Sequence, residues 1–131
     1  MKVEIAQVLD SQTQRVLFHS DVGTAAGIWA GSEPAKPGAA HVELDIPDEV
    51  SHWTLIDDAS STSIEDGIEP DSGVEIVATV VQVGDGEDPV VSIRIGTDIV
   101  MIEMPESRSG LAPGATIRFT TPEVRLSPYD L

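Results

Sequence analysis

The sequence predicts an all-β protein built as a single antiparallel β-barrel or barrel-like sandwich. Apolar and polar residues alternate with a period of two in several segments, which is the pattern of half-buried strands. Gly, Pro and Asp clusters separate these segments, as turns would. The apolar content is 40% but the aromatic content only 4%, so the core depends on Val and Ile, which favour sheets. A chain of 131 residues is expected to form one domain, and barrel closure would protect its sheet edges.

The first elements are expected to form a hairpin. Residues 2–9 alternate as a strand, residues 10–14 are a polar turn, and residues 15–19 return as a second strand.

The next segment permits one short helix near residues 21–30. Its apolar residues fall at helical spacing: Val22, Ala25, Ala26 and Trp29. Gly23 and Gly27 oppose a helix by about 1 kcal/mol each relative to Ala. Residues 31–38 contain two prolines and two glycines, and therefore predict a loop.

A second hairpin is predicted around the turn at residues 47–50. Its first strand alternates from Val42 to Ile46, and residues 52–56 are expected to pair back with Trp53 and Leu55 buried. This pairing would set His52 opposite Asp45, near Glu43, on the solvent face. Imidazole and carboxylate can bind zinc, but two further ligands are missing, so we expect a cross-strand charge pair and no metal site.

Residues 57–73 predict a long acidic loop between the N-terminal hairpins (1–56) and a C-terminal β unit (74–131). Long loops inside compact domains are usually functional or mobile. The loop carries the candidate partner-binding residues: Asp57, Asp58, Glu65, Asp66, Glu69 and Asp71.

The C-terminal β unit is the most regular part of the sequence. Five segments have strand character: 74–83, 90–95, 99–104, 116–120 and 123–127. Turn signals separate them, including Gly84–Asp88, where Asp-Gly favours a hairpin turn over a calcium loop.

Residues 74–130 resemble a small OB-type β-barrel, and most closely a TOBE domain. The resemblance lies in Ala78–Val80, in Val91–Gly96, and in Leu111–Phe119 followed by Pro122–Leu126. It implies a barrel fold and, as an alternative function, a standalone barrel that binds a small ligand. TOBE domains commonly accompany importer ATPases or bind oxyanions. This chain has no phosphate-binding glycine-lysine motif and no Asn, so neither of those activities is implied here.

Charge and composition restrict the partners. The net charge is −16, from 23 acids and 7 bases, which opposes binding to nucleic acids. Cysteine is absent, so disulfides and thiolate metal sites are excluded. No segment has the length of a membrane span or a signal peptide, so we expect a cytoplasmic protein. We also expect no cofactor.

No nucleophile elbow or comparable catalytic motif occurs, so we expect a protein that is not an enzyme. The function that fits these features is an acidic binding protein that engages a basic partner protein, as inhibitors and immunity proteins do. Two alternatives stay open: the small-ligand barrel, and a structural accessory protein whose acidity is an adaptation to salt.

Overall fold

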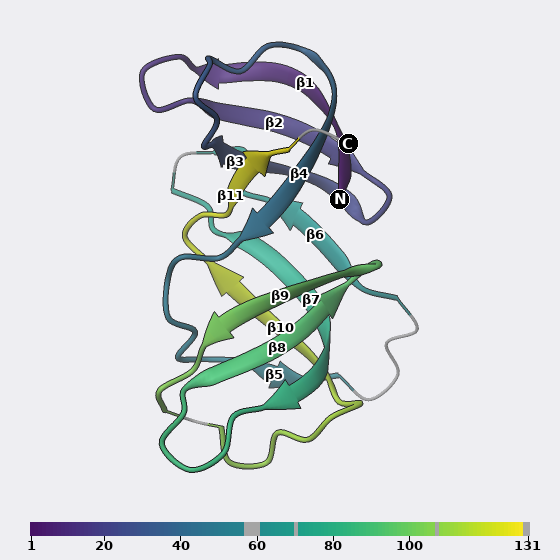
Figure 1. Cartoon of the computed structure of the whole chain (residues 1–131), viewed down its shortest axis with the longest axis vertical. Coiled ribbons are helices and arrows are strands. Elements are labelled where there is room, and N and C mark those ends of the chain that lie inside the picture. Colours follow the sequence, from purple (N-terminus) through teal and green to yellow (C-terminus); the bar gives the residue numbers. More distant parts are fainter. Residues whose placement is uncertain (57–60, 70, 107, 130–131) are drawn as a thin grey trace.

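The computed structural model describes residues 1–56, 61–69, 71–106 and 108–129, and within them all regular structure is β (Figure 1). The predicted all-β, barrel-like fold is confirmed. The strands are β1 (Lys2–Asp10), β2 (Arg15–Ser20), β3 (Gly23–Trp29), β4 (Gly38–Asp45), β5 (Thr54–Leu55), β6 (Ser63–Asp66), β7 (Val74–Val83), β8 (Val90–Ile95), β9 (Asp98–Glu103), β10 (Thr116–Thr121) and β11 (Arg125–Pro128). In this part of the chain no helix is long and apolar enough to cross a membrane.

Five strands close into a ring, which forms the upper part of the molecule in Figure 1. The order around the ring is β1, β2, β3, β11 and β4, and β4 pairs again with β1. All these pairings are antiparallel except that of β3 with β11. Closure therefore needs the last strand of the chain, which inserts between strands from the first third of the sequence.

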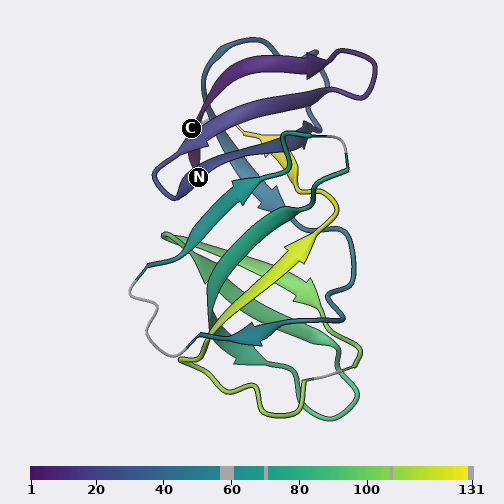
Figure 2. The ribbon, with the colours of Figure 1, turned by 180° about the vertical axis from the view of Figure 1, so that it is seen from behind.

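The other strands assemble around β7, the longest strand at ten residues. The first half of β7 lies between β6 and β10, and its second half pairs with β8 after a register shift between Val80 and Gln82. β9 extends the sheet beyond β8, and β5 extends it beyond β10. Figure 2 shows β6, β7 and β10 side by side on the face opposite to β9.

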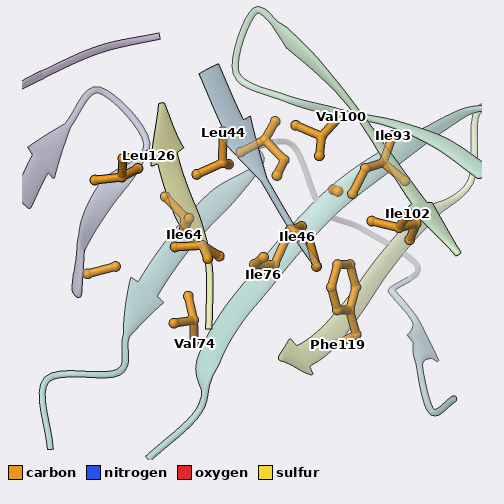
Figure 3. Close-up of a cluster of buried hydrophobic side chains, with 14 of the residues drawn as sticks. Leu44, Ile46, Ile64, Val74, Ile76, Ile93, Val100, Ile102, Phe119 and Leu126 are labelled. Atoms are coloured by element: carbon orange, nitrogen blue, oxygen red, sulfur yellow. The ribbon is translucent and has the colours of Figure 1, made fainter. Parts of the chain in front are cut away.

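One hydrophobic cluster connects the ring to the rest of the molecule (Figure 3). Leu44 and Leu126 come from ring strands, and they lie beside Ile64 and Ile76 of β6 and β7. Phe119 of β10 extends the same cluster toward β8 and β9. The buried positions alternate along β4, β8, β9 and β10, as the sequence pattern predicts.

The short helix near residues 21–30 is wrong, because this segment is strand β3. Its three central residues, Ala25, Ala26 and Gly27, are all buried, since β3 is covered on both faces. A Cβ atom at Gly27 would lie 3.1 Å from a methyl of Val124 and 3.3 Å from the Phe18 ring. This close packing favours glycine at position 27, and the antiparallel ladder to β2 keeps the segment extended.

The second predicted hairpin is also wrong. β4 pairs with β1 and β11, whereas β5 pairs with β10, so His52 does not lie across a ladder from Asp45. Leu55, predicted to be buried, is 50% exposed. The segment after Asp45 leaves the ring and crosses to the far end of the molecule, a path that no local turn signal encodes.

Two segment boundaries differ from the sequence prediction. The loop predicted over residues 57–73 contains β6, whose Ile64 is fully buried against β7. Within residues 74–130, β11 pairs with ring strands and not with its predecessors in sequence. The closed ring is thus formed mainly by residues 2–45 and not by the segment that resembles a TOBE domain.

Candidate functional site

The structure brings four of the predicted partner-binding acids to one place. Glu65 and Asp66 end β6, and Glu69 and Asp71 lie in the connection to β7; all four are exposed. We call these four residues the acidic turn. Asp57 and Asp58, predicted for the same surface, lie outside the described residues.

An arginine of the ring is hydrogen-bonded to the backbone of the acidic turn. The guanidinium of Arg15 on β2 donates to the carbonyl oxygens of Gly67 and Ile68, the latter at 2.6 Å. Ser72 closes the turn, with its backbone N–H and its hydroxyl both donating to the Glu69 oxygen, at 3.1 and 3.0 Å. The backbone between the carboxylates is therefore held by hydrogen bonds at Gly67, Ile68 and Glu69.

Like charges face each other beside the acidic turn. Glu65 on β6 is the register partner of Glu75 on β7. Glu75 forms an ion pair with Arg118 of β10, with 3.4 Å between Arg118 Nε and Glu75 Oε1. Glu65 has no ion pair among the described residues, so its charge adds to the field of the acidic turn.

The few arginines leave most of the acidic charge uncompensated. Arg15 and Arg108 are hydrogen-bonded to backbone carbonyls, and Arg108 reaches Gly84, Gly86 and Asp88. Across the described ranges, three acids form ion pairs: Glu75, Asp98 and Glu123. The negative field therefore extends into solvent, where it can attract a cationic partner.

The histidines occupy separate positions. His19 shares a hydrogen bond of 2.7 Å with the Thr24 hydroxyl, and His41 lies against the Tyr129 ring with 6.1 Å between centroids. Among the described residues, no three His, Asp or Glu side chains gather closely enough to hold a metal ion.

A groove that sequence reasoning did not identify lies between β4 and β9. Its volume is about 680 Å³. The groove is lined by Met1, Val42, Glu43, Leu44, Asp45, Thr97, Asp98, Ile99, Val100, Met101, Ser127 and Tyr129. We call it the β4–β9 groove.

The two walls of the β4–β9 groove differ in chemistry. The β9 wall presents Ile99 and Met101, which are 54% and 67% exposed. The β4 wall presents the exposed carboxylates Glu43 and Asp45. At one end, the Asp98 carboxylate forms an ion pair of 2.8 Å with the α-ammonium of Met1. The groove is thus apolar on one side and acidic on the other.

A sequence signal for the groove does exist. Residues 99–102 read Ile-Val-Met-Ile, an unbroken apolar run in a strand whose residues alternate between exposed and buried. Val100 and Ile102 are buried in the core, so Ile99 and Met101 must point outward. Apolar residues on both faces of a strand indicate that both faces meet apolar surroundings.

Comparisons of the chain with models of known families, with curated protein sequences and with solved structures found no match.

Proposed function

We propose that the protein is a non-enzymatic binding protein whose acidic surface engages a basic partner protein. The observation that carries this proposal is the acidic turn, where four exposed carboxylates are gathered on a backbone fixed by Arg15 and Ser72. Preorganised charge of one sign accelerates encounter with an oppositely charged surface and selects against acidic partners. A fixed backbone also lowers the entropy lost on binding.

The net charge supports the same proposal. A net charge of −16 on 131 residues disfavours phosphate-rich ligands and leaves basic proteins as the partners of complementary sign. Internal ion pairs do not neutralise the acidic surface, because only three of the described acids form one.

The test is affinity capture with the intact protein at low and high salt, followed by identification of the bound protein. We expect a basic protein, retained in stoichiometric amount at low salt and released as salt rises. A variant with all four acids of the acidic turn changed to Lys should associate more slowly, because rim charges act mainly on the association rate.

A matched variant controls for total charge. Asp48, Glu49, Asp85 and Glu87 are exposed acids outside the acidic turn, and changing them to Lys alters the net charge by the same amount. Equal slowing in both variants would show that total charge matters and that the acidic turn is not the contact. Unchanged association in the acidic-turn variant would contradict the proposal.

A further inference from the structure

We propose that the β4–β9 groove binds an extended, cationic and apolar segment of the partner, which pairs as an added strand with the free edge of β9. This inference rests on the proposed function for the sign of the partner's charge, and it names a different surface. The acidic turn begins at the end of β6, which is near the viewer in Figure 2, whereas β9 is near the viewer in Figure 1.

β9 is the one long strand with a free edge among the described strands. The ring strands β1, β2, β3, β4 and β11 each have at least two neighbours, and so do β6, β7, β8 and β10. Only β5 and β9 end the sheet, and β5 has two residues. β9 has six residues and pairs with β8 alone.

The backbone of β9 shows which groups face outward. The Glu103 carbonyl accepts a hydrogen bond from Val50, on the side away from β8, whereas the Met104 N–H donates to Pro89 on the β8 side. Orientation alternates along an antiparallel strand, and a residue's N–H and C=O point the same way. Ile99 and Met101 therefore direct their N–H and C=O groups away from β8, along the free edge.

Free edges are normally protected by Lys, by Pro or by shortness. β9 contains no Lys or Pro and is not short. Two of its three exposed side chains, Ile99 and Met101, are the most exposed large apolar residues of the described chain, and the third is Glu103 at its end. Unpaired backbone groups beside exposed apolar side chains are what strand addition uses for affinity and specificity.

The walls of the groove specify the incoming segment. In an extended segment, successive side chains point to opposite sides. Apolar side chains on one side would contact Ile99, Met101 and Tyr129. Cationic side chains on the other side would meet Glu43 and Asp45 on β4. A second copy of this chain would bring its own charge of −16 to these carboxylates, so charge complementarity favours a basic partner.

The probe is a fluorescein-labelled peptide of eight residues in which Lys and Val alternate. We expect salt-sensitive binding to the full chain by fluorescence anisotropy, with slower amide exchange at Ile99 and Met101 on binding. The matched control peptide has the same side chains but N-methylated Val residues, which removes backbone donors without changing charge. Its binding should be weaker by about tenfold or more.

Variants of β9 locate the site. Met101→Pro removes one outward N–H, and proline is tolerated at a free edge. Because the carbonyl of residue 101 and both groups of Ile99 remain, it should weaken the unmethylated peptide and reduce, without abolishing, the difference between the two peptides. Met101→Ala should weaken both peptides and keep the difference. If Met101→Pro does not fold, the comparison of the two peptides on the unaltered protein still decides.

Three outcomes would overturn the inference. One is equal binding of both peptides, which indicates charge attraction without strand pairing. Another is the absence of binding at low salt, which leaves the capture experiment and the acidic turn untouched. The third is a dimer in sedimentation that Met101→Pro dissociates, which shows that a second copy covers the edge. The proposed function is contradicted if the capture experiment retains no basic protein, and this outcome does not depend on whether the peptides bind.

Discussion

Replacing Gly23 by Ala tests how the ring is joined to the rest of the molecule. Gly23 begins β3 at a φ of +138°, a backbone conformation that side chains disfavour by about 1–3 kcal/mol. A Cβ atom there would lie 2.3 Å from the backbone oxygen of Ile64. β6 must therefore move away from β3, which endangers the 3.0 Å hydrogen bond from Ile64 N–H to the Val22 oxygen.

Gly38 offers a closely matched control. Its φ is +136°, but a Cβ atom there would meet nothing within 4 Å. Gly38→Ala therefore measures the conformational cost alone. Gly23→Ala adds the lost hydrogen bond, about 1 kcal/mol, and the disturbed packing of Ile64, so it should cost about 1–3 kcal/mol more than Gly38→Ala.

The measurement is urea unfolding of both variants, followed by tryptophan fluorescence and circular dichroism, with the slope compared to the unaltered protein. Since small domains have about 5–15 kcal/mol of stability, both variants should remain folded without urea. Equal losses of unfolding free energy in the two variants would refute the reasoning, because contact between β3 and β6 would then contribute nothing.

Four further predictions concern charge, loop fastening and packing. Glu65→Gln removes repulsion from Glu75 and should stabilise by about 0.2–1 kcal/mol in low-salt thermal melts; a gain that persists in 1 M KCl would contradict this origin. The unaltered protein should melt at higher temperature as KCl rises, because screening reduces its self-repulsion; a melting temperature that is unchanged by KCl would show that the acids repel little in the folded state. Arg108→Ala should speed amide exchange in residues 84–88 and leave the exchange of the buried strands unchanged, since among the described residues the Arg108 side chain donates hydrogen bonds to that turn alone. Ile76→Val should cost about 0.5–1.5 kcal/mol in urea unfolding, as its side chain is fully buried, and a neutral result would mean that the core there is loosely packed.

Strands with one buried face could be predicted from the sequence, because their alternation reports burial directly. β8 shows this: Val91, Ile93 and Ile95 are buried as predicted, and Arg94 between them is exposed. β3 could not be predicted, since it is covered on both faces and the requirement for small residues removes the alternation. Its pairing with β11 joins segments about a hundred residues apart, which no local pattern records.

The candidate site was predictable in part for the same reason. Glu65, Asp66, Glu69 and Asp71 are neighbours in sequence, so their proximity follows from the chain itself. What holds them is Arg15, from another hairpin, and that contact depends on where β6 packs against the ring. The β4–β9 groove depends wholly on tertiary structure, because its walls come from strands whose only relation is the path of the chain after Asp45.

The position of β9 at the free edge gives meaning to its unbroken apolar run. In a strand covered on both faces, Ile99 and Met101 would be ordinary core residues. At a free edge they keep two apolar side chains and the adjoining backbone groups in water, an arrangement that promotes association with another strand. The ring leaves no strand edge free, because β11 pairs with both β3 and β4 and so completes it. An edge left free beside a groove with one acidic wall is therefore better explained by a partner strand of opposite charge than by incomplete folding.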